Sequence, residues 1–453
     1  MMKAINPAND ELIEEYASHS PADVEEILSL TQSDWLVWKT TSFEHRATLM
    51  QNAADVLRKN KEKYARLMSL EMGKVITEAR AEVEKCAWVC EYYAEHAEGF
   101  LADEIVETEA SKSFVSFDPM GIVLAVMPWN FPFWQVFRFA APALMAGNAG
   151  ILKHASNVPG SALAIEEVFR EAGFPENIFR TLMISSGAVE GVLRDDRVRA
   201  ATLTGSEYAG MQVASIAGSE LKKTVLELGG SDPYIVLEDA DIPACVTTSA
   251  KARMINTGQS CIAAKRFIVV ESRLKEFEEA QAQILSNLKI GDPLEEDSQV
   301  GPLARRDLRD ELHDQVTRTL EAGGRLVTGG KFVDGPGAYY APTVISDVKK
   351  GMPIYTEETF GPVSAIIPVK DEEEAIRVAN DSEFGLGGSL WTADVKRGEE
   401  LARRVESGAV FVNGMTMSDP RMPFGGIKKS GYGRELGIYG IREFVNVKSI
   451  WIA

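Results

Sequence analysis

Apolar residues recur at helical spacing through most of the first hundred positions. Pro21 opens this region, and runs of apolar residues three and four positions apart follow it to residue 100. The pattern then changes, because residues 113–117 alternate in the manner of a strand. We therefore predict a helical N-terminal region that is followed by a strand.

Short apolar runs then alternate regularly with amphipathic runs. The short runs predict buried strands and the amphipathic runs predict helices, which together are typical of βαβ units with a parallel sheet. The rhythm restarts after Gly229-Gly230 and continues to about Pro368, so we predict two α/β domains in series. The predicted strands are 121–127, 150–153, 178–184, 200–204, 224–228 and 233–237, and the predicted helices are 132–145, 161–172, 188–193 and 207–216.

The C-terminal segment 443–452 alternates again, like a strand that has no partner in its own neighbourhood. A terminal strand of this kind often pairs with another subunit, because an open strand edge can pair with another chain. This segment therefore favours an oligomer.

Composition excludes several classes of function. At 453 residues the chain is too long for one core, and its four cysteines are too few for a disulfide framework. The formal net charge of −19 argues against nucleic acid or an anionic membrane as a general partner. The N-terminus is polar and acidic, and no apolar run approaches the length of a membrane span. We expect a cytoplasmic enzyme or binding protein.

Cys261 is the first candidate for chemistry. It follows the turn Asn256-Thr257-Gly258, where a thiol can be reached, although a lone cysteine is more often a small buried hydrophobe. Cys86, Cys90 and Cys245 lie in predicted helices and look structural. The five histidines form no cluster, so we predict no metal site.

Polar residues stand at the carboxyl ends of the predicted strands, where open α/β sheets bind ligands. Asn130 could stabilise an oxyanion or simply form a turn, and Lys153 could hold ribose hydroxyls or be a solvated lysine. Thr204-Gly205-Ser206 could bind pyrophosphate or merely cap a helix. Glu227, in an apolar strand end, could be a general base or a salt-bridged structural residue. No Gly-x-Gly-x-x-Gly string and no P-loop accompanies them.

Taken together, these strings resemble the aldehyde dehydrogenase superfamily over essentially the whole chain. Each string is weak alone, but their order and separations are similar to those of that family. They are Asn130, Lys153, Thr204-Gly205-Ser206, Glu227, Cys261, Glu358-Thr359-Phe360-Gly361-Pro362 and Pro423-Phe424-Gly425-Gly426.

The resemblance implies an α/β fold with two doubly wound parallel-sheet domains and an oligomerisation β-element. The dinucleotide-binding domain, a variant Rossmann domain without the glycine fingerprint, would comprise residues 1–100 and 118–229. Residues 230–429 would form the catalytic domain, and residues 101–117 and 438–453 the oligomerisation element. The implied assembly is a homodimer or a dimer of dimers.

The resemblance also implies a role for each site residue. Cys261 would be the nucleophile, Glu227 the general base, and Asn130 with the Cys261 backbone N–H the oxyanion hole. The residues implied for the cofactor are Trp129, Lys153, Ser156, Gly205, Ser206, Glu358 and Phe360. The implied reaction oxidises an aldehyde to a carboxylic acid through a cysteine thiohemiacetal and thioester.

Ser156 indicates which dinucleotide is used. Many NAD-preferring relatives have an acidic residue three positions after the strand-end lysine, whereas this chain has Ser156, which would leave room for a 2′-phosphate. We therefore expect NADP to be preferred, with NAD as a weaker alternative.

Arg138 indicates the substrate, because it is the one charged residue in the apolar run 131–144. A buried guanidinium needs an anion, either an internal carboxylate or a substrate carboxylate. Arg138 and Ser418 match carboxylate-contacting positions of succinate-semialdehyde dehydrogenases, and the resemblance adds Trp134 to this pocket. A second arginine found in some members is Ile255 here, and a redox partner of the nucleophile is Ala263.

Succinic semialdehyde is therefore the expected substrate, with another small aliphatic aldehyde or semialdehyde as the alternative. A thiol esterase that needs no cofactor belongs to a different class and remains open on the residues alone. A coenzyme A-acylating dehydrogenase and a non-catalytic structural protein are less favoured, because Glu227 and the rest of the catalytic set are retained.

Overall fold

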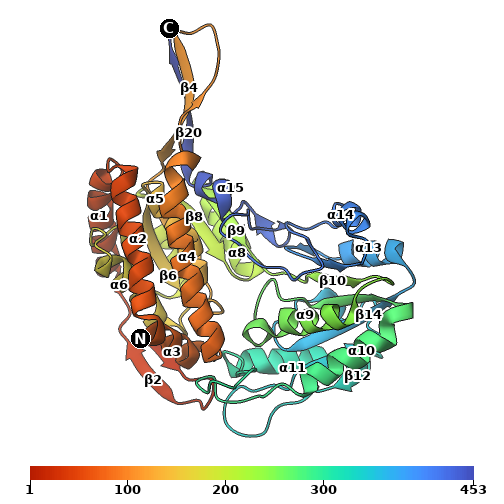
Figure 1. Cartoon of the computed structure of the whole chain (residues 1–453). Helices are drawn as coiled ribbons and strands as arrows, with labels where there is room; N and C mark the ends of the chain where they lie inside the picture. The colour runs from red at the N-terminus through yellow and green to blue at the C-terminus, as the bar shows by residue number, and fades with distance from the viewer.

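The computed structural model describes residues 1–453, which form two α/β lobes and a projecting ribbon (Figure 1). One lobe is built on a six-stranded sheet, the other on a seven-stranded sheet, and the ribbon on a three-stranded sheet. No helix combines the length and apolar content needed to cross a bilayer, and no group of His, Cys, Asp and Glu side chains is arranged to hold a metal ion.

The helical N-terminal region is confirmed, but a hairpin precedes it. The first sixteen residues form two antiparallel strands joined by a turn in which Asp10 has a φ of 65°. Ser20 begins the first helix with a capping box to Asp23, and Gly73, at a φ of 80°, ends the third. The elements are β1 (Met2–Ile5), β2 (Leu12–Tyr16), α1 (Pro21–Trp38), α2 (Phe43–Lys59), α3 (Lys61–Met72) and α4 (Ile76–Phe100).

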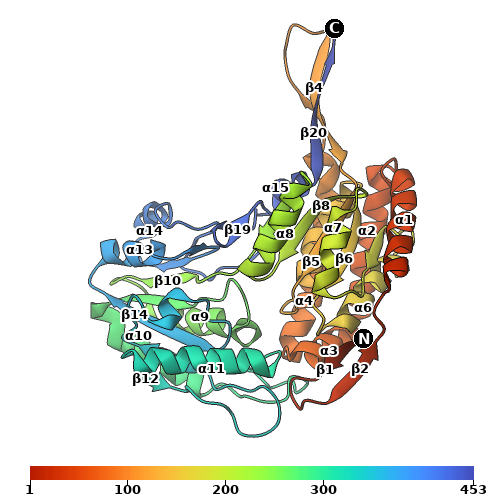
Figure 2. The same cartoon turned by 180° about the vertical axis from the view of Figure 1, so that it is seen from behind.

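The first lobe contains a sheet with the strand order β19-β9-β8-β5-β6-β7, parallel except for β19. Helices α7 and α8 lie in front of this sheet in Figure 2, and α2 and α4 lie on the opposite side with α5. The strands are β5 (Ile122–Met127), β6 (Ala149–His154), β7 (Phe179–Thr181), β8 (Val198–Thr204), β9 (Lys223–Glu227) and β19 (Gly431–Tyr432). The helices are α5 (Trp134–Met145), α6 (Pro159–Glu171), α7 (Val189–Arg194) and α8 (Glu207–Ser219).

The strand order of this sheet creates a crevice. β5 lies between β6 and β8, so the chain runs outward on one side of β5 and later returns on its other side. Ligands of open α/β sheets bind at such a switch point, outside the carboxyl ends of the strands. The loops after β5, β6, β8 and β9, which carry the predicted site residues, all leave this edge.

The second lobe contains a sheet with the order β12-β13-β14-β11-β10-β16-β17, in which only β12 is antiparallel to its neighbour. The βα rhythm, expected to continue to about Pro368, in fact extends to Val412, because β16 and β17 add to the β10 edge. The strands are β10 (Pro233–Val236), β11 (Arg266–Val270), β12 (Arg325–Thr328), β13 (Thr343–Ser346), β14 (Val363–Val369), β16 (Ser389–Trp391) and β17 (Phe411–Val412). The helices are α9 (Ile242–Met254), α10 (Glu271–Ser286), α11 (Arg306–Glu321), α12 (Pro353–Thr356), α13 (Glu372–Asn380) and α14 (Val395–Ala402).

The C-terminal strand β20 (Val445–Ile452) has a partner within the chain. It pairs antiparallel with β4 (Lys112–Pro119), which also pairs with β3 (Glu104–Ile105), and the three project from the body as a ribbon (Figures 1 and 2). The partner lies far upstream in sequence, which is why the local pattern made β20 look unpaired. One edge of β20 still has no neighbouring strand. The remaining short elements are β15 (Phe384–Gly385), β18 (Ile427–Lys428) and α15 (Gly437–Arg442).

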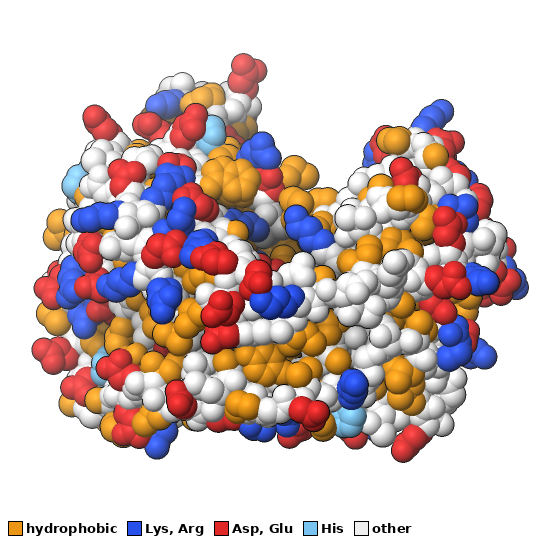
Figure 3. Space-filling model, turned by 60° about the horizontal axis from the view of Figure 1, so that its bottom comes forward, with side chains coloured by type: hydrophobic (Ala, Val, Ile, Leu, Met, Phe, Trp, Pro, Cys, Tyr) orange, Lys and Arg blue, Asp and Glu red, His pale blue; other side chains and the backbone are white.

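Charged side chains of both signs are interspersed over the face shown in Figure 3. The excess of acidic residues therefore forms no single acidic patch on this face, and the cationic side chains that matter for ligands lie in the cavities described next.

Candidate active site

Cys261 lies in the loop that enters β11, where the second lobe faces the crevice of the first. It is the only one of the four cysteines that is not buried, which agrees with the structural reading of Cys86, Cys90 and Cys245. The accessible thiol is therefore the one that the sequence singled out.

A left-handed turn places this thiol. Asn256, Thr257 and Gly258 have φ values of 52°, 56° and 76°, a conformation that costs a non-glycine residue on the order of 1 kcal/mol or more. The buried guanidinium of Arg253 fixes the turn, because it donates to the carbonyl oxygens of Gly258 at 2.7 Å and Gly361 at 2.5 Å. A Cβ on Gly258 would lie 2.3 Å from the Gly361 carbonyl oxygen and 2.6 Å from Arg253 Nη2, so only glycine fits there.

Asn130 follows β5 and contacts the same turn. Its Nδ2 donates to the Gln259 carbonyl at 3.0 Å, its Oδ1 accepts from Gln135 at 3.0 Å, and its own carbonyl accepts from Asn256 at 2.7 Å. These bonds hold the amide beside the cysteine loop and leave one Nδ2 proton for another acceptor. The structure thus brings Asn130 and Cys261 together.

Glu227 ends β9 and is buried, and neither of its carboxylate oxygens has a hydrogen-bond partner. Burial raises its pKa well above the ordinary value, Arg138 opposes this rise, and Glu435 adds to it. Glu227 forms no salt bridge, so the alternative prediction of a salt-bridged structural glutamate is wrong. An unpaired buried carboxyl with a raised pKa is suited to accepting and returning a proton.

Two cavities meet at Cys261. One, of about 260 Å³, is lined by Trp134, Arg138, Ser418 and Phe424 as well as Cys261. The other, of about 300 Å³, is lined by Cys261, by Asn130 and by five predicted cofactor residues, Trp129, Gly205, Ser206, Glu358 and Phe360. The thiol therefore faces two separate spaces, and each can hold a different ligand.

The thiol is held in its protonated form at rest. The residue is partly exposed, but the protein atoms around its sulfur desolvate the thiolate and raise the pKa of Cys261 to about 12, while the charges of Lys265 and Arg138 act to lower it. A nucleophilic reaction at this sulfur therefore requires a nearby group that accepts its proton.

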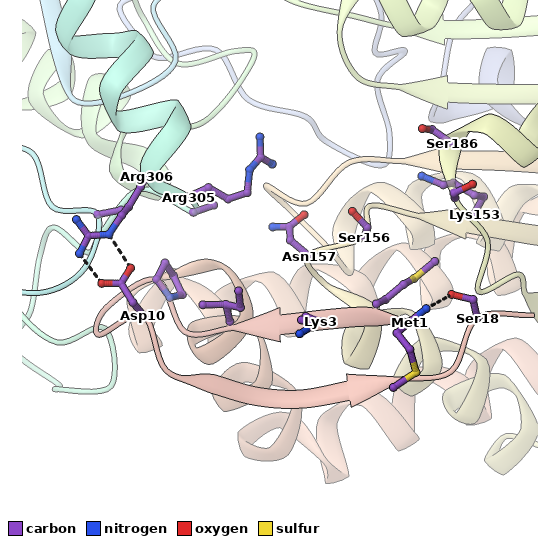
Figure 4. Close-up of a pocket in the computed structure, with 16 residues that line it drawn as sticks. Met1, Lys3, Asp10, Ser18, Lys153, Ser156, Asn157, Ser186, Arg305 and Arg306 are labelled. Carbon is purple, nitrogen blue, oxygen red and sulfur yellow. Dashed lines mark hydrogen bonds and ion pairs between the residues drawn. The ribbon is translucent and has the colours of Figure 1, made fainter.

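A third cavity, of about 600 Å³, is lined by residues of both lobes and of the N-terminal hairpin (Figure 4). Lys153 and Ser156 line it from the first lobe, and Arg305 faces it from the second. Burial lowers the pKa of Lys153, whose ammonium has no ion-pair partner. The only carboxylate of the lining, Asp10, is paired with Arg306 at 2.5 Å. Arg305 is paired with Asp307 and Lys3 with Glu15, so Lys153 and the N-terminal ammonium are the lining cations without a carboxylate partner. Their charge fits a phosphate-bearing ligand.

Glu358 is fixed between the lobes. Its Oε1 accepts from the Gly230 N–H at 3.0 Å and from Lys265 Nζ at 3.1 Å, and Lys265 also donates to the Cys261 carbonyl at 2.7 Å. A Cβ on Gly229 would lie 2.6 Å from Glu358 Oε2, so the Gly229-Gly230 pair permits this close approach. Lys265 thus contacts both the Glu358 carboxylate and the backbone of Cys261.

For Ser206 and Arg138 the structure contains the structural role that the sequence offered as an alternative: a helix cap for Ser206 and an internal ion pair for Arg138. Ser206 caps α8, accepting from the Ala209 N–H at 3.3 Å, while still lining the cofactor cavity. Arg138 forms an ion pair with Glu435, donates to Thr204 Oγ1 at 3.3 Å, and lies 4.5 Å from the Phe424 ring centroid. The anion that Arg138 requires is therefore supplied within the chain, although its side chain also lines the substrate-side cavity.

Comparison with known proteins agrees with this arrangement. The family model described as "Aldehyde dehydrogenase family" matches residues 1–450. The chain belongs to the aldehyde dehydrogenase family.

Several similar family members are named succinate-semialdehyde dehydrogenase. A probable succinate-semialdehyde dehydrogenase [NADP(+)] from Synechocystis is 53% identical over 99% of both chains. Succinate-semialdehyde dehydrogenase [NADP(+)] 1 from Mycobacterium tuberculosis is 49% identical over 99% of both. The crystal structure of succinic semialdehyde dehydrogenase from Streptococcus pyogenes in complex with NADP+ is 39% identical, with a TM-score of 0.98 and full coverage of both chains. The aldehyde dehydrogenase fold is thereby confirmed.

Several residues of this aldehyde dehydrogenase site were missed in the sequence: Lys85, Arg253, Lys265 and Glu435. Arg253 and Lys265 stand beside or within apolar runs, a signal that was used for Arg138 and would have found them. Lys85 also stands beside an apolar run, residues 86–90, so the same signal applies to it. Glu435 lies beside Arg434 among glycines, where nothing in the local pattern distinguishes it from a surface residue.

We expect Gly258→Ala to lower the free energy of unfolding by roughly 1–3 kcal/mol, because alanine is strained at this φ and its Cβ meets Arg253. The midpoint of denaturant unfolding and the rate of Cys261 alkylation measure the effect. Gly218→Ala is the matched control, because Gly218 lies in α8 with open space around it. Equal midpoints for the two variants would contradict the role assigned to the turn.

Proposed function

We propose that this aldehyde dehydrogenase oxidises succinic semialdehyde to succinate, with NADP as the preferred cofactor and NAD as a weaker one. The position of Cys261 at the junction of a substrate-side cavity and a cofactor-side cavity carries the proposal. The printed names of the similar proteins support the choice of substrate and cofactor.

In the proposed mechanism Cys261 is the nucleophile. The ionised form of Glu227 accepts the thiol proton and later releases it to solvent. The resulting thiolate forms a bond to the aldehyde carbon and turns the carbonyl oxygen into an alkoxide. The remaining Asn130 N–H and the Cys261 backbone N–H donate to this oxygen and stabilise its charge. When bound, the dinucleotide supplies the acceptor for the hydride. Cys261 then carries the acyl group as a thioester.

Glu227 is the proposed general base. It accepts a proton from the water that attacks the thioester and returns this proton to the departing sulfur, so that the carboxylic acid and the free thiol of Cys261 form. The carboxylate is not among the residues that line the two cavities, so this step requires a side-chain rotation toward Cys261. Its lack of any hydrogen-bond partner makes that rotation inexpensive.

The substrate-side cavity supports an aldehyde with a polar far end. We propose that Trp134 packs on the carbon chain, and that Arg138 and Ser418 donate to the carboxylate. Arg138 Nη1 has no partner of its own, so the guanidinium can serve Glu435 and a substrate together.

On the cofactor side we propose that Lys153 and Glu358 hold ribose hydroxyls and that Gly205 and Ser206 meet the pyrophosphate at the start of α8. Trp129 and Phe360, whose ring centroids lie 5.8 Å apart, would border the nicotinamide end. Ser156 leaves space for a 2′-phosphate in a cavity that carries uncompensated positive charge.

The domain boundaries, the assembly and the location are also proposed. Residues 1–100 and 118–229 would bind the dinucleotide, residues 230–429 would carry the nucleophile, and residues 101–117 and 438–453 would form the oligomer contact. The open edge of β20, with Val447 and Trp451 more than half exposed, supports a homodimer or a dimer of dimers. Four free cysteines fit the reducing cytoplasm.

The main test compares succinic semialdehyde with butyraldehyde, using NADP and NAD in parallel and following the reduced cofactor. We expect kcat/KM with NADP to be at least about tenfold higher for succinic semialdehyde, since a buried charged hydrogen bond is worth about that much. Cys261→Ala should produce no NADPH. Normal turnover by that variant would contradict the assignment of the nucleophile.

Glu227→Gln should give a burst of NADPH that matches the number of active sites, followed by little turnover, because the amide cannot take the proton of the attacking water. Rapid-mixing kinetics measure the burst and the steady rate. Glu383→Gln, which alters an exposed carboxylate paired with Lys429, is the control. A full steady-state rate for Glu227→Gln would count against its role.

Ser156→Glu should reverse the cofactor preference, because a carboxylate repels a 2′-phosphate and accepts a hydrogen bond from a 2′-hydroxyl. The Michaelis constants for NADP and NAD measure the change. Ser156→Ala removes the hydroxyl without adding charge and should keep the preference for NADP. An unchanged preference in Ser156→Glu would refute this part of the proposal.

A further inference from the structure

The substrate-side cavity contains a lysine whose charge no carboxylate neutralises. Lys85, on α4, lines this cavity together with Cys261. Its Nζ donates to Ser418 Oγ at 2.7 Å and lies 4.3 Å from the ring centroid of Trp134. Lys74 and Arg138 nearby both form ion pairs, whereas Lys85 forms none.

Lys251, the other unpaired lysine of this lining, is exposed to solvent, and the remaining neighbouring charges largely cancel without Lys85. Arg138 is paired with Glu435, and Lys74 is paired with Glu82. Glu78, also in the lining, has its pKa raised to about 7 by burial, so it carries only part of its charge at neutral pH. The ammonium of Lys85 therefore remains as a positive charge within the cavity without a partner.

An unpaired ammonium in such a place is costly, and the pKa of Lys85 reflects this cost. Burial lowers the pKa to about 8, and the positive charge of Arg138 on α5 adds to the effect. Cys86 and Glu82 on its own helix and Asp419 on the loop after Ser418 act in the opposite direction. A bound anion would offset this free-energy cost, because it would form the ion pair that the Lys85 ammonium lacks.

We infer that Lys85 binds the far carboxylate of the substrate and is a determinant of specificity for aldehydes that carry an acidic group. This inference rests on the proposed function and deepens it. The pocket then has a second cation besides Arg138, at a position that differs from the missing arginine at Ile255.

Ser418 completes the proposed contact. In the structure its oxygen accepts from Lys85, so its own proton is free to be donated. Lys85 and Ser418 together can thus offer two donors to the two oxygens of one carboxylate, one from an ammonium and one from a hydroxyl. A neutral aldehyde such as butyraldehyde fills the same space without using either donor.

The test uses the ratio of kcat/KM for succinic semialdehyde to kcat/KM for butyraldehyde. In Lys85→Met this ratio should fall roughly ten- to hundredfold, mainly through the Michaelis constant for succinic semialdehyde. Lys85→Arg keeps a cation and should retain most of the ratio. Lys39→Met is the matched control, because Lys39 also lies over a tryptophan ring, that of Trp35, but far from the cavity lining.

The pH dependence gives a second readout. The charged form of Lys85 is present below its pKa, so in the parent enzyme the ratio should be high near neutrality and fall as pH rises past about 8. Ionisation of Cys261 affects both substrates alike and cancels in the ratio. In Lys85→Arg the part of the fall above about pH 8 should disappear, because a guanidinium stays charged throughout this range, whereas any fall near pH 7 that comes from ionisation of Glu78 should remain.

Three results would overturn the inference. One is an unchanged ratio in Lys85→Met, and another is a loss that appears instead in Lys251→Met, since Lys251 is the exposed lysine of the same lining. The third is a ratio of the two kcat/KM values that does not fall with pH in the parent enzyme. This measurement tests the inference even if Lys85→Met does not fold. A parent enzyme that does not prefer succinic semialdehyde over butyraldehyde would instead refute the proposed function, and the inference with it.

Discussion

The buried guanidinium of Arg253 is the interaction on which the rest of the site depends. It reaches the carbonyl oxygens of Gly258, Ala264 and Gly361, so it ties the cysteine loop both to the start of β11 and to the segment after Glu358. No carboxylate neutralises it, and burial lowers its pKa to about 9. Carbonyl dipoles alone therefore hold the charge, and they can do so only while the left-handed turn keeps them in place.

This arrangement explains why charges are distributed so unevenly around Cys261. Arg138 and Lys74 each have a carboxylate partner, Lys265 is shared among two carbonyl oxygens and Glu358, and Glu227 has no partner. Because the paired groups neutralise one another, they add little net charge to the cavity linings. The unpaired ones are the groups to which a reaction or a ligand can add a proton or a charge.

The sequence predicts the fold and much of the site because the candidate site residues stand at the ends of predicted strands. Asn130, Lys153, Ser206 and Glu227 follow four parallel strands, and parallel strands in one sheet end at one edge, so their proximity follows from the pattern alone. Contacts that join distant segments give no local signal. The ion pair of Arg138 with Glu435 is the main example. The sequence predicts that Arg138 has an anionic partner, but it does not distinguish a substrate carboxylate from one within the chain.

The last strands of the chain have a consequence for how the protein is made. β19 completes the sheet of the first lobe beside Glu227, Glu435 neutralises Arg138, and β20 pairs with β4, yet all three come from the final residues. During synthesis the first lobe therefore keeps an open sheet edge, and the guanidinium of Arg138 has no carboxylate partner. Both last until the ribosome has finished the chain. Such late, long-range closure slows folding and exposes the unfinished lobe to association with other chains. A polypeptide released early would contain the thiol, the amide and the glutamate, but not the segments that shield them.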